Sequence, residues 1–372
     1  MDSNLSKSRR PLVKQGTILE SLRQQIISGE LMPGSRMPTR DELAVRFGVT
    51  RMTLQRAMDQ LSRDGFILAR GKLGTFVADN PPHLSSYALI YYCTPDEESW
   101  PRFWTALANE AVTLERTRPI TISTYYGVHG STENDDYQKL LHDVRARRLA
   151  GLIFTSMPDY LQRTPIAEDD TPQVAIMWPK AGYRIPAVYP DLASFVDRAL
   201  DALAAKGRKR VAVVGNVLWW DQMQHHFIEG AKARGMEFRP YWAQMVEPLN
   251  AHRAVHLLMH NQQQTRPDAL IIADDNLVEH STAGLLAAGV RVPTDADVVV
   301  HCKFPWPVAS ILPVMRLGFD ARRVMAACLE TLDMQRRGET PPTFTSVSAM
   351  FENEIDIAAT QLGIATQAPV KE

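Results

Sequence analysis

The sequence lacks the features that mark several large classes of protein. Only three cysteines, Cys93, Cys302 and Cys328, occur in 372 residues, and no CxxC pair is present. Few and widely separated cysteines are typical of reduced, buried thiols rather than of a disulfide framework. No run of eighteen apolar residues occurs, and the first residues are polar and basic. We therefore expect a cytoplasmic protein without a secretion signal or a membrane-spanning segment.

Motifs of catalysis are missing as well. The chain contains no G-x-S-x-G, no P-loop and no G-x-G-x-x-G, and no Ser/His/Asp set stands out. We expect a protein that is not an enzyme and needs no cofactor. His252, His256 and His260 have the spacing that presents imidazoles to a metal from one helix. Because Arg253 and the polar run 261–264 indicate a solvated face, we expect no metal site there.

What the chain does contain is an ordinary globular composition, with 45% apolar and 22% charged residues. Its length suffices for two or three domains. The net charge of −1 hides an asymmetry: residues 1–80 hold 13 basic and 8 acidic residues, and the remainder holds 28 and 34. A head of charge +5 on a body of charge −6 favours a nucleic-acid-binding module attached to a part that does not touch nucleic acid.

Residues 38–65 predict two helices joined by a tight turn. Thr39 and Glu42 form a capping-box pattern at the start of the first helix, and Thr50 can cap the second. A glycine follows each helix. Apolar residues at helical spacing define one buried face; they are Leu43, Ala44, Phe47, Leu54, Ala57, Met58 and Leu61. We interpret this segment as a helix-turn-helix.

The segments around this helix-turn-helix predict a winged helix. Residues 17–28 form an amphipathic helix pattern, after a polar arm at residues 1–15 that we expect to be disordered. Residues 66–70 and 75–77 predict a β-hairpin, whose loop holds Lys72 and Gly74 and can bring a cation and bare amides to the DNA.

The order GELMPGSRMPTRDELAVRFGVTRMTLQRAMDQLSRDGFILARGKLGTFV resembles the GntR-type winged-helix domain over its whole length. The resemblance implies DNA binding by residues of the capped helices and the wing: Thr39, Arg40, Thr50, Arg51, Met52, Thr53, Gln55, Arg56, Lys72 and Gly74. Three positions depart from the family, which usually has an acidic residue and then Arg where Arg40 and Asp41 stand, and Arg where Gln55 stands. Gln pairs with adenine and Arg with guanine, so Gln55 predicts an altered half-site.

From residue 87 the chain alternates strand and helix patterns, which predicts parallel sheets with helices on both faces, in two lobes. The expected strands are 87–93, 120–126, 149–155, 174–177, 210–214, 269–273, 298–301 and 344–350. The expected helices are 103–116, 135–148, 192–206, 222–234, 251–261, 277–288 and 320–337. Two prolines make residues 79–86 a short, stiff linker.

This body resembles the LacI/periplasmic-binding-protein fold. The resemblance is carried by RRLAGLIF, PAVYPDLASFVDRALDALAAKGRKRVAVVG, FIEGAKARG and ADDNLVEHSTAGLLAAGVRVPTDADVVV, in that order. It implies two lobes that close on a small effector, often a sugar, and a homodimer built through the body. We therefore expect a winged helix at 1–78, a linker at 79–86, an effector and dimerisation domain at 87–355 and a tail at 356–372.

Ligands of open α/β sheets bind beyond the carboxyl ends of the strands. The candidate effector residues at these places are Asp96, Ser156, Trp178, Trp219, Trp220, Asp221, Asp275, Lys303 and Trp306. Their rings, carboxylates and amides suit a polyhydroxylated ligand, although the tryptophans can instead be packing residues. Asp275 matches an acidic ligand-contacting position of the family. Lys303 stands where the family usually has Asp, which favours an anionic effector such as a sugar phosphate or acid.

These patterns together predict a dimeric, effector-responsive transcription regulator, a repressor, that binds palindromic double-stranded operator DNA. The alternative is a carbohydrate-binding protein or carbohydrate-active enzyme without a role at DNA.

Overall fold

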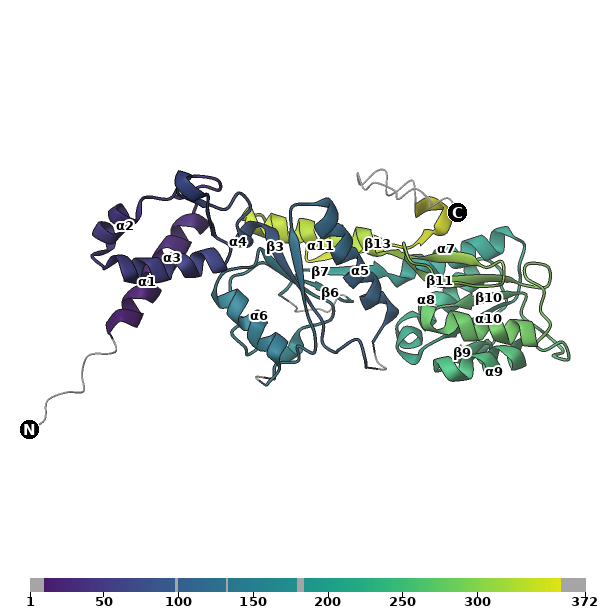
Figure 1. Cartoon of the computed structure of the whole chain (residues 1–372). Coiled ribbons are helices and arrows are strands. Elements are labelled where there is room, and N and C mark those ends of the chain that lie inside the picture. The colour runs from purple at the N-terminus through teal and green to yellow at the C-terminus, as the bar shows by residue number, and fades with distance from the viewer. Residues whose placement is uncertain (1–9, 98–99, 132, 179–183, 356–372) are drawn as a thin grey trace, which may run out of the picture. The chain divides into compact units, whose positions relative to one another are not determined.

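The computed structural model describes residues 10–97, 100–131, 133–178 and 184–355 (Figure 1). The predicted tail at 356–372 and most of the predicted arm lie outside the described residues. The prediction of a polar arm at 1–15 is wrong at its end, because helix α1 spans Arg10–Ile27.

The N-terminal part is a winged helix. It consists of α1, α2 (Arg40–Phe47), α3 (Arg51–Arg63), β1 (Ile67–Ala69), a 3₁₀ turn η1 (Gly71–Leu73) and β2 (Thr75–Val77). The predicted capping box is present, since Thr39 accepts from the Glu42 amide and the Glu42 carboxylate accepts from the Thr39 amide. Gly48 ends α2 with φ 60°, in the left-handed region that glycine adopts without strain. Strands β1 and β2 pair antiparallel.

The core of the winged helix comes from the predicted apolar face and from α1. Leu22, Leu43, Leu54, Leu61 and Phe66 are fully buried in one cluster. This packing fixes α3 with its polar face turned outward.

The predicted linker, residues 79–86, contains a short helix. Residues Pro82–Ser85 form one helical turn, α4, and the first strand of the body begins directly after it at Ser86. Pro82 packs near Gly65, and the His83 ring stacks on Phe66 at a centroid distance of 5.8 Å. The linker therefore packs against the winged helix.

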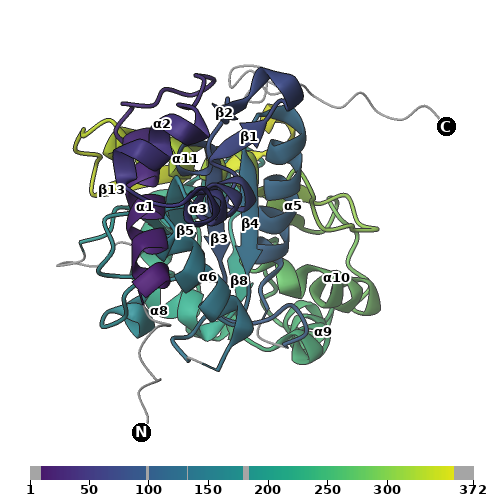
Figure 2. The same cartoon turned by 60° about the vertical axis from the view of Figure 1, so that its left-hand side comes forward.

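The body contains two six-stranded sheets (Figures 1 and 2). The first has the order β13-β7-β6-β5-β3-β4, with β3 (Ser86–Ile90), β4 (Thr121–Tyr125), β5 (Gly151–Phe154), β6 (Gln173–Ile176), β7 (Ala187–Asp191) and β13 (Phe344–Ser348). The second has the order β14-β12-β11-β10-β8-β9, with β8 (Val211–Gly215), β9 (Ala243–Met245), β10 (Ala269–Ile272), β11 (Asp297–Phe304), β12 (Met315–Asp320) and β14 (Met350–Phe351). Neighbouring strands β8, β10, β11 and β12 run parallel, and β14 is antiparallel to β12.

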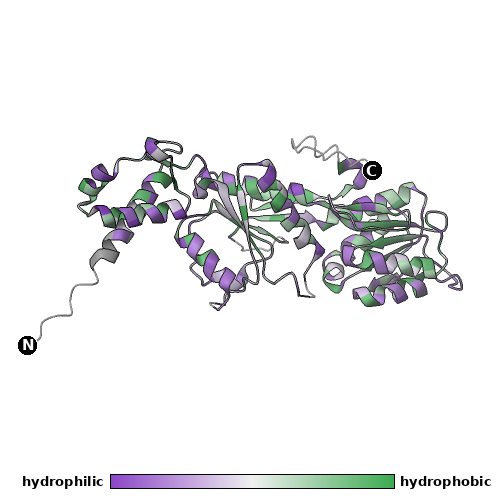
Figure 3. Ribbon diagram, in the orientation of Figure 1, coloured by the Kyte–Doolittle hydropathy of each residue, from purple (hydrophilic) through white to green (hydrophobic). Residues whose placement is uncertain are grey.

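Amphipathic helices accompany these strands. They are α5 (Arg102–Thr117), α6 (Asp135–Arg145), α7 (Leu192–Ala205), α8 (Val217–Ala233), α9 (Pro248–Met259), α10 (Val278–Ala287) and α11 (Ala321–Arg336). Short 3₁₀ turns lie at η2 (Asp159–Leu161), η3 (Pro240–Trp242), η4 (Asp275–Leu277) and η5 (Glu352–Glu354). Figure 3 shows predominantly hydrophobic strands and helices that carry both hydrophilic and hydrophobic residues, as parallel sheets covered by helices require.

By the density of contacts the chain divides into two units. Among the described residues, the first comprises those from 10 to 95, 112 to 174 and 332 to 340, and the second comprises those from 96 to 111, 175 to 331 and 341 to 355. Core clusters line both faces of the second sheet: Val214, Leu270 and Val300 on one, Val213, Ile271 and Val299 on the other.

Several element boundaries differ from the prediction. Helix α8 begins at Val217 rather than at 222, because Asn216 caps it through the Trp219 amide. Strand β11 continues to Phe304 rather than ending at 301, since it pairs with β12 along its second half. Strands β7, β9 and β12 were not predicted.

Candidate nucleic-acid interface and effector site

Helix α3 separates a buried face from a polar one. Leu54, Ala57, Met58 and Leu61 point into the core, whereas Arg51, Met52 and Arg56 are exposed. Thr53 and Gln55 are half-buried, and the Thr53 hydroxyl lies 3.0 Å from the Thr50 hydroxyl. Thr39, Arg40 and Thr50 are exposed at the starts of the two helices. The predicted DNA-contacting residues of α2 and α3 thus share the exposed ends and polar side of the helix-turn-helix.

The wing brings Lys72 and Gly74 to an exposed turn, and it adds an arginine that the sequence analysis did not single out. Arg36 pairs with Phe76 through a β-bridge. A Cβ placed on Gly74 would lie 3.2 Å from Arg36 Nε, so the guanidinium lies close to the wing glycine, whose φ is 107°. Arg36, Lys72 and the bare Gly74 backbone form a cationic wing that can approach phosphates.

Two carboxylates also lie on this face. Asp41 Oδ1 is 2.6 Å from Arg51 Nη2, and Gln55 Nε2 donates to Asp59 Oδ1 over 2.6 Å. Both pairs join a predicted DNA-reading residue to an acidic neighbour. Of these acidic partners, Asp41 belongs to the inverted Arg40-Asp41 pair noted in the sequence, and Asp59 lies one helical turn after Gln55.

In the body, the structure connects two of the candidate effector residues through a third residue, His301. Lys303 Nζ lies 3.1 Å from His301 Nε2. His301 Nδ1 lies 3.8 Å from Asp275 Oδ1, which is longer than a hydrogen bond. All three side chains are buried. His301 and Lys303 share a face of β11 by their spacing of two, which could have pointed to this cluster.

Aromatic rings enclose the Lys303 ammonium. Its Nζ lies 4.8 Å from the Phe103 ring centroid and 5.2 Å from that of Phe319. Such distances are those of cation–π contacts, which hold a cation in an apolar setting. Lys303, which was expected beyond the end of its strand, lies within β11 and is buried.

The charges in this cluster are shifted by burial and by one another. Burial alone would raise the pKa of Asp275, but the adjacent His301 and the charge of Lys303 outweigh burial and hold that pKa at about 2. Burial lowers the pKa of Lys303, although Asp275 and Asp274 offset part of this effect. Burial, and then Lys303, lowers the pKa of His301, so its imidazole is neutral at neutral pH.

The tryptophans divide into two kinds. Trp219 is buried in a core cluster and stacks on Trp220 at 6.3 Å, which favours packing for this residue. Trp178 and Trp306 remain 40% and 41% exposed, which leaves ring surface available to a ligand. Among the described atoms, Trp219 Nε1 and Asp275 Oδ2 are buried and have no hydrogen-bond partner.

The remaining candidates differ in their burial and in the unit to which they belong. Asp221 is exposed on α8, and Asp96 is exposed after the first strand of the body. Ser156 is half-buried and belongs to the first unit, whereas the other eight candidates belong to the second.

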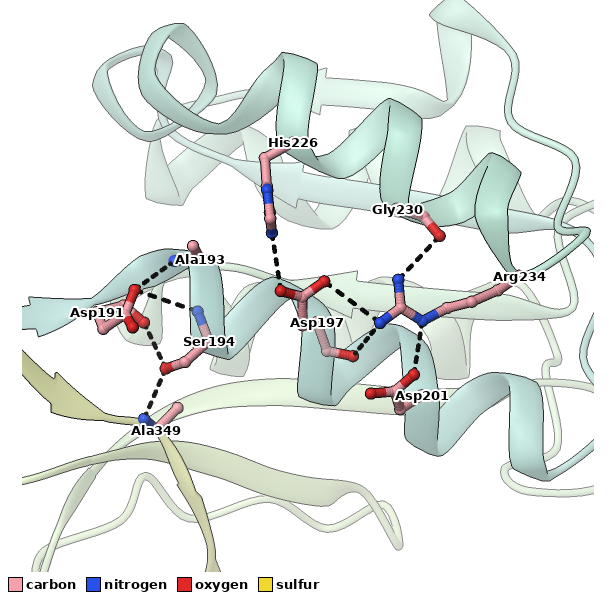
Figure 4. A network of polar contacts seen from close by, with 9 residues as sticks. All are labelled: Asp191, Ala193, Ser194, Asp197, Asp201, His226, Gly230, Arg234 and Ala349. Atoms are coloured by element: carbon pink, nitrogen blue, oxygen red, sulfur yellow. Dashed lines mark hydrogen bonds and ion pairs between the residues drawn. The ribbon is translucent and has the colours of Figure 1, made fainter.

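A polar network holds α8 against α7 (Figure 4). Asp197 pairs with His226 Nε2 at 3.0 Å and with Arg234 Nη2 at 3.3 Å. Arg234 also donates to Asp201 and to the Gly230 carbonyl oxygen. His226 and Arg234 of α8 therefore both tie this helix to α7 through Asp197.

No metal centre is apparent within the described ranges, where no group of three or more His, Cys, Asp or Glu side chains could hold an ion. His256 and His260 approach each other, with ring centroids 5.5 Å apart. In the same part of the chain, none of the helices has the length and apolar character needed to cross a bilayer.

The two parts of the chain match two known patterns. The bacterial regulatory proteins of the gntR family match residues 14–77, and the periplasmic binding protein-like domain matches residues 200–351. The chain joins a gntR-family helix-turn-helix domain to a periplasmic-binding-protein-like body.

The curated relatives match over stretches about as long as the gntR-family domain. An HTH-type transcriptional regulator of Mycobacterium tuberculosis is 40% identical over 78 residues, which are 21% of this chain and 28% of that protein. The mannosyl-D-glycerate transport/metabolism system repressor MngR of Escherichia coli is 37% identical over 83 residues, 22% of this chain and 34% of that protein. The chain thus spans about a third or less of the length of these relatives.

Solved structures match the body. A LacI-family transcriptional regulator from Rhizobium etli has a TM-score of 0.57 at 15% identity and covers 72% of this chain and 98% of its own. A LacI-family regulator from Arthrobacter in complex with lactose has a TM-score of 0.54 at 15% identity, covering 72% and 97%. These likenesses confirm the predicted fold of the body.

Proposed function

We propose that the protein is a transcription regulator, a repressor, that binds a palindromic operator as a homodimer and responds to a small-molecule effector. The observation that carries this proposal is the exposed polar face of α3 on a winged helix joined to an effector-binding type of body. The regulators and repressors among the relatives support it. Such a protein acts in the cytoplasm, where its DNA is, and has no catalytic role.

We propose Arg40, Arg51, Thr53, Gln55, Arg56 and Lys72 as DNA contacts, with Thr39, Thr50, Met52 and Gly74 beside them. Arg and Lys contacts to phosphate supply affinity, which therefore falls steeply with salt. Gln55 supplies part of the sequence preference, because its amide can bond adenine at two atoms. Arg36 joins this set through its position beside the wing.

The effector that fits best is a neutral, polyhydroxylated molecule such as a sugar. Asp275 Oδ2 is a buried acceptor without a hydrogen-bond partner among the described residues, and buried polar groups normally find one. A hydroxyl group of the ligand can donate to it. Lys303 gives less support to an anionic effector than its sequence position suggested, because His301 and two rings already surround its ammonium.

Selection of bound duplexes from random DNA tests the DNA role. We expect a palindromic site, and we expect Gln55→Arg to replace adenine by guanine at one position of each half-site. An unchanged selected site would overturn the role of Gln55. Absence of any selected sequence would defeat the regulator and favour the alternative, a carbohydrate-binding protein without a role at DNA.

Thermal-shift screening of sugars, sugar acids and sugar phosphates tests the effector. A neutral sugar that raises the melting temperature should also change affinity for the selected operator, because linkage requires the ligand to bind the two states differently. A ligand that stabilises the protein but leaves operator affinity unchanged would contradict its role as effector.

A further inference from the structure

Two carboxylates contact side chains that we propose as DNA contacts, Arg51 and Gln55. Asp41, in the first turn of α2, contacts Arg51 across the turn at 2.6 Å. Asp59, one turn along α3, accepts from Gln55 Nε2 at 2.6 Å. Acidic groups on a DNA-binding face oppose phosphate binding, so their presence beside two predicted contact residues calls for an explanation.

A contribution to folding stability does not explain the Asp41–Arg51 pair. The side chains of Arg51 and Asp41 are 78% and 66% exposed. An ion pair this open to solvent contributes only about 0–1 kcal/mol. The pair therefore contributes little to folding, whereas its charges lie at the start of α3, among the proposed DNA contacts.

We propose that Asp41 and Asp59 are specificity-determining residues that act by positioning Arg51 and Gln55. This inference rests on the proposed DNA-binding function. Asp41 neutralises Arg51 toward the phosphates of arbitrary DNA and holds its guanidinium in one place. Arg51 then contributes its full binding energy only on a DNA sequence that offers base-edge acceptors at that place.

Asp59 acts on Gln55 through hydrogen-bond chemistry. A carboxylate accepts and cannot donate, so it binds the amide nitrogen of Gln55 and excludes the flipped amide. One N–H of Gln55 remains free beside its carbonyl oxygen. That donor and acceptor are the two groups needed to bond N6 and N7 of adenine.

The test compares DNA binding by full-length Asp41→Asn, Asp59→Asn and wild-type protein, using the selected operator and a scrambled duplex over a series of salt concentrations. Asp41→Asn should bind scrambled DNA more tightly. The slope of log K against log salt should steepen by about one, because one more phosphate contact becomes available. The ratio of operator to scrambled affinity should fall about tenfold, the size of one base contact.

Asp59→Asn should relax the adenine preference opposite Gln55 and leave the salt slope unchanged, because Gln55 carries no charge. Glu30→Gln is the matched control. It removes one negative charge from an exposed ion pair of the same domain, Glu30 with Arg46 at 3.7 Å, that holds no predicted DNA contact. This control should keep the operator preference of the wild type, and melting curves should show that all variants fold.

The inference fails if Asp41→Asn keeps the wild-type ratio and slope, or if Glu30→Gln changes them equally. Retention of the adenine preference in Asp59→Asn would remove Asp59 from the proposal. Wild-type protein that prefers no sequence would instead refute the proposed function, so the two failures are distinguishable.

Discussion

At the scale of single residues, Lys303 is unusual because it is a buried lysine. Its charge depends on neighbouring groups, Asp275 among them, for compensation. Removing one partner of a buried charge pair leaves the other uncompensated, which costs about 3–5 kcal/mol. We therefore predict that Lys303→Met and Asp275→Asn each lower the free energy of unfolding by about 3 kcal/mol. The double variant should lose less than the sum, with a coupling of about 1–3 kcal/mol, as denaturant melts of all four proteins would measure.

Strict additivity of the two losses would show that Asp275 and Lys303 do not stabilise each other. Phe103→Leu is a useful control for the cation–π contact. It keeps the apolar contact with Lys303 but removes the ring face, so it should be less damaging than either change of charge.

Residues of this kind mark the limit of prediction from sequence. Asp275 and Lys303 could be proposed because they lie near the ends of strands, a position that sequence patterns reveal. The burial of Lys303 could not be predicted, because the rings around its ammonium, Phe103 and Phe319, belong to two other elements, α5 and β12.

At the scale of elements, His83 in α4 makes the folding stability depend on pH. Burial, and then the charge of Arg336, lowers the pKa of His83 to about 4. In the unfolded chain the histidine titrates near 6.5, so that state binds more protons between these two values. Stability from neutral His83 is therefore complete above about pH 6.5 and is lost as the pH falls toward 4.

His83→Phe should abolish this loss, because phenylalanine keeps the stacking on Phe66 but does not titrate. We predict that the melting temperature of the variant falls less between pH 7.5 and pH 5 than the melting temperature of the wild type does. The comparison uses this drop for each protein, so a constant difference between the two proteins does not affect it. Parallel curves for the two proteins over this range would contradict a neutral, half-buried His83.

The wing provides a second prediction at this scale. Gly74 has φ 107° and lies against Arg36, so Gly74→Ala strains the backbone and pushes the guanidinium away. We expect about tenfold weaker binding to operator DNA, the effect of roughly 1.4 kcal/mol, with the melting of the body unchanged. Gly71→Ala, where no atom lies within 4 Å of the added Cβ, separates the two effects, because it strains the same turn but leaves Arg36 in place.

Elements with strong local signals were predictable, and elements defined by pairing were not. The capping box and apolar face located α2 and α3 because caps and periodicity act within a few residues. Strand β12, MRLGFD, and strand β7, AVYPD, carry Arg, Gly, Pro or Asp, so their local pattern is weak. They are strands because β11 and β13 pair with them, and such pairing is not visible in the sequence.

At the scale of the whole molecule, the basic residues 1–80 and the acidic remainder of the chain should interact with DNA in opposite ways. The basic head supplies attraction to phosphate, and the acidic body is repelled by it, so a single head on a single body should bind DNA weakly. Affinity then has to come from joining two heads. The proposed homodimer does this, because binding of the second half-site becomes intramolecular and gains about 10²–10⁴-fold in affinity.

This argument yields the last prediction, made on the full-length protein. A duplex with the complete selected palindrome should bind at least about 100-fold more tightly than one in which one half-site is scrambled. Inserting five base pairs between the half-sites should abolish most of that gain, because it turns them onto opposite sides of the helix. Fluorescence anisotropy at fixed salt measures all three duplexes, and light scattering measures the mass of the free protein. Equal affinity for the intact and half-scrambled duplexes would show that one winged helix is enough, and the palindromic, dimeric mode of binding would then be wrong.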